Sequence, residues 1–447
     1  MPVLYELILS WMPAHATLAA VLAVAIPCGV AIGVVLFLAG FSTYLERKLA
    51  ADIQRRIGPN KCNVGTFLGD WARLVVANGK GPKAGFHGKM MGLTFIPLVP
   101  LFDLGDKILT RLAPGFMIFM ADGLKLIMKE DIIPDAVDKP LFRLAPILVL
   151  VSALAAVAAL PYSDAWYLAD FNIGIFYIAA VTSIEVLGIL MAGWASNNKW
   201  ALLGGMRSAA QIVSYELPVG IVIATAIVLS GTLSMQNMTL DQFGFAAGGA
   251  YNQGWFWNWN IFQPVMFILA PVYFLAALAE CNRTPFDIPE AESELVSGYH
   301  TEYSGMRFGL FFMAEYTMMF VTSAIAVTIF LGGWSTGIGP LEKLLMAHGP
   351  DFAGNGAMTS APVFHWYGTL IHLGVFLAKT YGLVMLMMWI RWTLPRFRVD
   401  QMMSLCWKKL IPIGLICLFA VCAWMLLCMP LWVMFFINNW TGSVGRR

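Results

Sequence analysis

Four ionisable residues lie inside long apolar stretches of the sequence, where a charge is costly. They are Glu185, Glu216, Glu315 and Lys379. A charged side chain at the centre of a bilayer costs about 2.5–3.5 kcal/mol on insertion scales. A carboxylic acid in apolar surroundings holds its proton more readily than in water, which suits reversible protonation. The pattern favours an ion or proton path, and the alternative is static pairing of Lys379 with one of the glutamates.

The densest acidic segment of the chain runs from residue 280 to residue 302 and reads ECNRTPFDIPEAESELVSGYHTE. Asp287 followed by Glu290 fits the start of a helix. Glu290 and Glu294 would then be neighbours on that helix, where like charges repel, so the segment needs partner cations or shared protons. Two simpler interpretations stay open: a helix start alone, or a solvated acidic face. The acidic residues of this segment are Glu280, Asp287, Glu290, Glu292, Glu294 and Glu302.

A third candidate site is the segment YLERKLAADIQRRIGPN, at the end of the first apolar stretch. Its basic residues, among them Arg47 and Arg56, are explained by anchoring at the membrane boundary alone. Glu46 gains nothing from that role. Arginine and glutamate beside an apolar entrance can bind the polar head of a lipid-soluble ligand.

Membrane-spanning helices must position these residues. Of the 447 residues, 59% are hydrophobic and 12% are charged, whereas a soluble domain is about 45–50% apolar and about 25% charged. This composition excludes a soluble multidomain enzyme and a disordered chain, and a net charge of +2 gives no sign of a nucleic-acid partner. Eight apolar stretches approach the roughly 20 residues that a helix needs to cross a bilayer, which predicts an all-α polytopic membrane protein with a single membrane domain. The stretches are 16–43, 144–162, 174–195, 213–231, 263–280, 308–332, 366–391 and 409–436.

Basic residues predict the orientation of these spans. Of the 28 Lys and Arg residues, 24 lie in the connections that follow the odd-numbered spans, including the long first loop at 44–143. Because basic loops stay in the cytoplasm, both termini are expected on the outer side. The seven cysteines form no CxxC pair, which speaks against an iron–sulfur or zinc site.

These segments together resemble the membrane subunit of respiratory complex I (NADH:quinone oxidoreductase) that joins the hydrophilic arm to the proton-pumping arm. The resemblance implies a multi-pass subunit of the bacterial inner membrane that binds no cofactor of its own and meets quinone as a substrate. Its partners would be other subunits of the complex, quinone and lipid. The matching segments are ERKLAADIQRRIGPN (46–60), ADGLKLIMKE (121–130), and the blocks 193–216, 279–316 and 389–412.

The resemblance also implies roles for individual residues. The quinone chamber would include Glu46, Arg47, Arg56, Arg207 and Arg283. The proton path would include Glu185, Glu216, Glu280, Asp287, Glu290, Glu292, Glu294, Glu302, Glu315 and Lys379. Two features depart from the family pattern: an insertion at about 74–114, and Glu185, which adds a proton site or pairs with Lys379.

Other functions agree with the same residues. One is the homologous membrane subunit of an energy-converting hydrogenase or of a ferredoxin- or F420-linked complex, in which no quinone need bind. Another is a stand-alone ion transporter that uses the glutamates of the spans. A purely structural anchor is disfavoured, because it would not need costly charges in the membrane.

Overall fold

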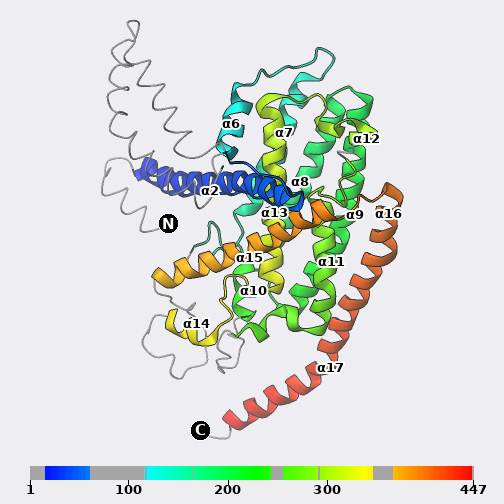
Figure 1. The fold of residues 1–447 in the computed structure, drawn as a ribbon. Coiled ribbons are helices and arrows are strands. Elements are labelled where there is room, and N and C mark those ends of the chain that lie inside the picture. Colours follow the sequence, from blue (N-terminus) through cyan, green and yellow to red (C-terminus); the bar gives the residue numbers. More distant parts are fainter. Residues whose placement is uncertain are drawn as a thin grey trace. The chain divides into compact units, whose positions relative to one another are not determined.

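The chain is helical in the computed structural model, which describes residues 16–60, 115, 118–164, 166–242, 255–289, 292–345 and 366–444 (Figure 1). Within those ranges the only β-structure is an isolated bridge between Pro161 and Tyr167. The prediction of an all-α polytopic membrane protein is confirmed. The predicted insertion at about 74–114 lies outside the described residues.

Helices coincide with all eight predicted apolar stretches. Six of the described helices are long and apolar enough to cross a membrane, and α11 is a shorter apolar helix. The number of eight spans and the single membrane domain stay predictions. The helices of the apolar stretches are α2 (Ala16–Ile53), α7 (Lys139–Val157), α8 (Gly174–Ala195), α9 (Lys199–Ser230), α11 (Pro264–Glu280), α13 (Gly305–Phe330), α15 (Trp366–Thr393) and α17 (Ile411–Val444).

Shorter helices occupy the connections. They are α6 (Ile118–Met128), α10 (Met235–Gln242), η2 (Phe256–Asn258), η3 (Asn260–Phe262), α12 (Glu292–Leu295), η4 (Gly298–His300), α14 (Gly339–Leu345), α16 (Val399–Leu405) and the π-helical turn η5 (Cys406–Leu410). The chain forms two compact units. Unit 1 comprises Met1–Asp135, Glu302–Thr317 and Met385–Thr393, and unit 2 comprises Ala136–Thr301, Met318–Val384 and Leu394–Arg447.

In unit 2, small residues let the helices α7, α8 and α9 pack closely side by side (Figure 1). A Cβ atom added to Gly188 of α8 would lie 2.4 Å from Val149 of α7. Gly193 of α8 faces Gly205 of α9, where a Cβ atom would lie 3.3 Å from the opposite Cα. Helices in membranes associate through such close backbone contacts, because lipid supplies no hydrophobic drive between them.

Helix α9 has clear signals at both ends. The side chain of Asn198 accepts a hydrogen bond from the N–H of Trp200 at the start, and Gly231 ends the helix in the left-handed conformation at φ 67°. Inside the helix, Pro218 has no N–H to offer the carbonyl of Ser214. The thiol of Cys406 donates to that carbonyl instead, at 3.1 Å, so the proline also links α9 to the π-helical turn.

In unit 1, α6 packs on α2 and on the first part of α13. The rings of Phe37 and Phe119 meet edge to face, with centroids 5.4 Å apart. A Cβ atom added to Gly309 would lie 2.9 Å from the side chain of Leu126. The unit therefore brings the end of the first span beside residues far along the chain.

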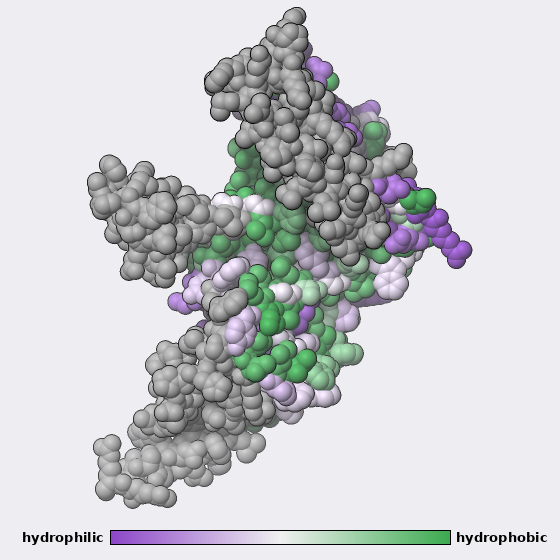
Figure 2. All heavy atoms as spheres, turned by 60° about the vertical axis from the view of Figure 1, so that its left-hand side comes forward, coloured by the Kyte–Doolittle hydropathy of each residue, from purple (hydrophilic) through white to green (hydrophobic). Residues whose placement is uncertain are grey.

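Large apolar side chains reach the surface of the described helices, as Figure 2 shows for one face of the molecule. Phe176, Leu187, Phe267 and Phe419 are between 62% and 68% exposed. Such exposure is expected where lipid, rather than water, surrounds a helix.

Candidate functional site

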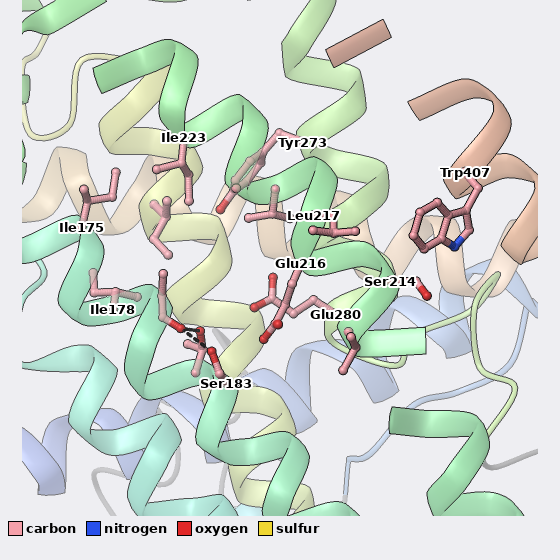
Figure 3. Close-up of a pocket in the computed structure, with 16 residues that line it drawn as sticks. Ile175, Ile178, Ser183, Ser214, Glu216, Leu217, Ile223, Tyr273, Glu280 and Trp407 are labelled. Carbon is pink, nitrogen blue, oxygen red and sulfur yellow. Dashed lines mark hydrogen bonds between the residues drawn. The ribbon is translucent and has the colours of Figure 1, made fainter. Parts of the chain in front are cut away.

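A cavity of about 470 Å³ lies in unit 2, between residues of α8, α9, α11 and α13 (Figure 3). Its wall is mostly apolar, and two carboxylates, Glu216 of α9 and Glu280 of α11, line it together. Figure 3 shows these two side chains next to each other, with Ser183 of α8 nearby. Apolar residues of the wall include Ile175, Ile178, Leu217, Ile223, Tyr273 and Trp407.

The local structure explains why these two carboxylates meet. Glu216 lies two residues before Pro218, in the part of α9 that the thiol of Cys406 contacts. Glu280 is the last residue of α11, which packs along α9. The side-chain amide of Gln211 donates to the carbonyl of Ala279 at 2.8 Å and fixes the end of α11 against α9.

No Lys or Arg pairs with Glu216 or Glu280 among the residues that the structure describes. The electrostatic neighbour of Glu280 is Glu216 itself. Two carboxylates that face each other in an apolar cavity are not both ionised without a large cost, so a proton on one of them stabilises the pair. The arrangement is therefore suited to taking up and releasing a proton.

Cys281 follows Glu280 and shows which other charges lie near the pair. The electrostatic neighbours of its thiol are Glu280, Glu185 and Arg283. Glu185 and Arg283 are buried, with 6% and 3% of their surface exposed. The structure thus brings a third predicted proton-path residue and one basic residue close to the end of α11.

The acidic segment after α11 is held by arginines from other parts of unit 2. Arg207 of α9 lies 2.6 Å from Glu294, and Arg396 lies 3.1 Å from Asp287. The prediction that this segment needs partner cations is confirmed at these two carboxylates. Glu290 and the side chain of Glu292 lie outside the described residues.

In unit 1, Glu46 is the centre of a second polar cluster. Its buried carboxylate accepts a hydrogen bond from the hydroxyl of Tyr316 at 2.5 Å and forms an ion pair with Arg391. Arg47, on the neighbouring position of α2, lies 2.7 Å from Asp122 of α6. The cluster offers a polar head group the acceptor oxygens of the carboxylate and the remaining N–H donors of the arginines.

The remaining predicted residues are placed as follows. Arg56 is exposed, Glu315 is buried in α13 and Glu302 is half-buried. The predicted chamber residues Glu46, Arg47 and Arg56 belong to unit 1, and Arg207 and Arg283 belong to unit 2. Their sharing of one quinone chamber stays a prediction.

Lys379 does not pair with Glu185 or with any other predicted proton-path residue whose side chain the structure describes, so the expected pairing with Glu185 is wrong. Its ammonium group donates to the carbonyls of Leu331, Gly333 and Ser335 at 2.7, 3.1 and 2.6 Å. It also lies 4.1 Å from the ring centroid of Trp259. The reason is the turn around Gly333, which points several backbone carbonyls at one position.

Sequence reasoning included Arg207, which pairs with Glu294, but it missed the partners Asp122, Tyr316, Arg391 and Arg396. Asp122, Arg391 and Arg396 lie within the segments that carry the resemblance, and the two arginines counted only toward the orientation of the spans. Tyr316 follows the predicted Glu315 directly. Each partner is 75 to 345 residues distant along the chain from the carboxylate or arginine that it contacts, so spacing gives no signal of these pairs.

Comparisons with known proteins agree on one family. The NADH dehydrogenase family model matches residues 107–422. The chain is 49% identical over 317 residues to the H subunit of NADH-quinone oxidoreductase from Anaeromyxobacter dehalogenans, covering 70% of this chain and 72% of the relative. It is 43% identical over 361 residues to the corresponding protein of Chlorobaculum parvum, covering 75% and 93%. It is 39% identical over 422 residues to that of Bacteroides fragilis, covering 92% and 95%.

Proposed function

The chain belongs to the family of the NADH-quinone oxidoreductase H subunits, and from this premise we propose that it binds quinone and couples quinone reduction to proton movement. It is a multi-pass membrane subunit of the oxidoreductase. In this proposal the chain carries no redox centre, and electrons reach quinone from a neighbouring hydrophilic subunit. The proposal includes a bacterial inner-membrane location with both termini on the outer side, and quinone and lipid as partners.

The observation that carries the proposal is the meeting of Glu216 and Glu280 in an apolar cavity. Ion pairing, which explains Asp287 and Glu294, does not explain these two carboxylates, since no cation pairs with them in the described part of the chain. A group that shares a proton with its neighbour responds strongly to a nearby change in charge, because their titrations are coupled. Such a pair can pass on the charge change that accompanies quinone reduction.

The cluster around Glu46 supports the quinone-binding part of the proposal. Tyr316 and Arg391 orient a buried carboxylate in unit 1, and α2 and α6 bring Arg47 and Asp122 into the same unit. A quinone head group needs hydrogen-bond donors at its carbonyl oxygens and an apolar path for its tail. The guanidinium groups of Arg391 and Arg47 each have five N–H donors, so they keep donors of that kind beyond those that face Glu46 and Asp122.

The names of the relatives favour this function over a hydrogenase-type complex. The relatives from Anaeromyxobacter, Chlorobaculum and Bacteroides are each named as a subunit of NADH-quinone oxidoreductase. A stand-alone transporter would work without its neighbours, whereas the proposed function requires the assembled complex.

The test is Glu216→Gln in the assembled complex, in closed membrane vesicles. The amide keeps the size of the side chain and cannot ionise, so the group no longer takes up or releases a proton. We expect protons pumped per NADH oxidised to fall at least about twofold, because the carboxylate pair can no longer share a proton. Asp170→Asn, which neutralises an exposed carboxylate, is the matched control and should leave the ratio unchanged. An unchanged ratio in Glu216→Gln, with a complex that assembles normally, would refute the proposed role of the pair.

A further inference from the structure

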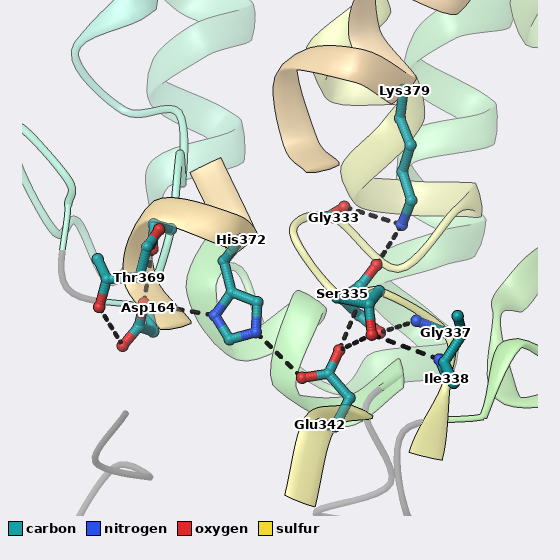
Figure 4. A network of polar contacts seen from close by, with 11 residues as sticks. Asp164, Gly333, Ser335, Gly337, Ile338, Glu342, Thr369, His372 and Lys379 are labelled. Carbon is teal, nitrogen blue, oxygen red and sulfur yellow. Dashed lines mark hydrogen bonds and ion pairs between the residues drawn. The ribbon is translucent and has the colours of Figure 1, made fainter. Parts of the chain in front are cut away.

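A second group of buried ionisable residues lies in unit 2, and the proposed function does not use it as such (Figure 4). Its centre is His372 on α15, whose side chain has no exposed surface. One ring nitrogen, Nε2, lies 3.0 Å from Oε2 of Glu342, and the other, Nδ1, lies 3.6 Å from Oδ1 of Asp164. The imidazole thus lies between two carboxylates. The ring centroids of His372 and Trp334 are 4.6 Å apart.

Each carboxylate is fixed by further donors from its own segment. Glu342 accepts hydrogen bonds from the N–H and the hydroxyl of Thr336, at 2.6 and 2.7 Å. Asp164 accepts one from the hydroxyl of Ser163 at 2.6 Å. The carboxylates are therefore held in position independently of the histidine.

Lys379 completes the charge balance of the group. It lies seven residues after His372 on α15, and Glu342 is its electrostatic neighbour. Ser335, whose carbonyl accepts from Lys379, belongs to the same connection as Glu342. With His372 protonated, two cations balance two carboxylates. With His372 neutral, one buried negative charge has no counter-charge within the group, which is costly in a site of low polarity.

Hydrogen-bond chemistry also favours a protonated His372. An imidazolium ion has two N–H donors, whereas a neutral imidazole has one N–H and one acceptor nitrogen. Only the protonated ring can present a donor to both Glu342 and Asp164. When the ring loses a proton, the lone pair of one ring nitrogen faces a carboxylate oxygen, and that contact becomes repulsive. The longer contact, to Asp164, is the one expected to open first.

We propose that Asp164, His372, Glu342 and Lys379 form a proton-binding site, separate from the Glu216–Glu280 cavity, in which the proton on His372 ties two connections of unit 2 to α15. The connections are those between α7 and α8, which carries Asp164, and between α13 and α15, which carries Glu342. When the proton leaves Nδ1 for water, the contact between α15 and Asp164 opens.

Among the residues that the structure describes, the carboxylates of Asp164 and Glu342 are the charged groups that face the imidazole. The ammonium group of Lys379 is an electrostatic neighbour of Glu342. Burial raises the pKa of Asp164, but the neighbouring His372 and the hydrogen bond from Ser163 outweigh that effect and hold this pKa below its usual value. An ionised Asp164 is what the protonated histidine requires.

A reporter cysteine tests the proposal in the whole complex, purified in detergent and kept without NADH and quinone. Thr369 lies beside Asp164, with its hydroxyl 3.3 Å from Oδ2, and is 6% exposed. Thr369→Cys is labelled with a maleimide from about pH 6 to about pH 9, a range that begins near the ordinary pKa of histidine. Ile338→Cys, at a position 52% exposed in the α13–α15 connection, corrects for the greater reactivity of any thiol at high pH.

We expect the ratio of the two labelling rates to rise at least about fivefold across this range, and to be independent of pH in a His372→Gln background. A flat ratio when His372 is present would overturn the proposal, and so would an unaltered rise after His372→Gln. If the complex with His372→Gln does not assemble, the Glu342→Gln variant is labelled over the same pH range in its place. Removing one charged partner of the imidazolium shifts the midpoint of the rise to lower pH by about one unit or more, and an unshifted midpoint would overturn the proposal.

The result does not depend on the proposed function. Labelling is measured in the resting complex, so a failed Glu216→Gln test leaves it unaffected. Conversely, a flat labelling ratio would leave the pumping measurement intact.

Discussion

Breaking the ion pair between Glu46 and Arg391 should weaken quinone binding more than neutralising both partners. Arg391→Met removes the cation and leaves the carboxylate of Glu46 buried, with Tyr316 as its remaining hydrogen-bond donor among the contacts described above. Removing one partner of a fully buried pair costs about 3–5 kcal/mol. The side chain of Arg391 is 26% exposed and that of Glu46 is 8% exposed. Because water reaches the arginine, we expect roughly half of that cost, about 2 kcal/mol.

The double variant Glu46→Gln with Arg391→Met shows whether quinone binding is weakened by the loss of the arginine itself or by the buried carboxylate that has lost its cation. It has no stranded charge, and the amide oxygen of glutamine still accepts a hydrogen bond from Tyr316. We therefore expect a smaller loss in the double variant than in Arg391→Met alone, with a coupling of about 1.5–3 kcal/mol, the usual range for a hydrogen bond to a charged group.

The assay is NADH-driven reduction of a short-chain quinone by the assembled complex, titrated for the apparent KM, together with the temperature at which activity is lost. An energy of about 2 kcal/mol corresponds to roughly a 30-fold change in an equilibrium constant. Tyr316→Phe serves as a control that removes one neutral donor and no charge. A double variant as impaired as Arg391→Met, in both KM and thermal stability, would refute the reasoning, because it would show that the arginine acts without its pair.

Two further predictions concern stability. Gly204 approaches η4 so closely that an added Cβ atom would lie 2.7 Å from Cα of Gly298; Gly204→Val should therefore cost about 1–3 kcal/mol, measured as a lower temperature of inactivation, whereas Gly220→Ala, with nothing within 4 Å, should be nearly neutral. Because its hydrogen bonds hold the pKa of Asp164 below the usual value, its contribution to stability is present above about pH 4 and is lost as the pH falls through the folded-state pKa. Asp164→Asn should therefore flatten the acid side of a plot of thermal stability against pH, and an acid side as steep as in the unmodified complex would contradict this assignment.

The sequence predicts the helical elements well and the partners of the charged residues poorly. Uniform apolar stretches long enough for a span leave only the helix as a solution, since lipid offers the backbone no hydrogen bonds. Glu216 could be chosen as a candidate because it costs free energy in an apolar stretch, and Glu280 because it begins the densest acidic segment. Their meeting in one cavity depends on the packing of α11 along α9, which residues such as Gln211 determine through contacts 68 positions away in the chain.

His372 shows the limit of that reasoning most clearly. A single histidine in an apolar stretch looks like a packed core residue, and its two carboxylate partners lie in connections, where acidic residues are common. Asp164 is 208 positions before it and Glu342 is 30 positions before it, so no periodicity links the three. The sequence indicates Lys379 as a candidate because a charge is costly in a span, but its partners are backbone carbonyls, which a sequence does not distinguish from any others.

Unit 2 therefore contains buried ionisable groups of two kinds. Around His372, two carboxylates meet two groups that can carry positive charge, and each carboxylate also has neutral donors. A balanced group of this kind gains from keeping its charges, and it loses from any change in proton number. Glu216 and Glu280 have no such balance, so their lowest-energy state holds a proton that a small change in nearby charge can shift. The proposed function uses a site of the second kind, because an unbalanced pair exchanges its proton without first breaking an ion pair.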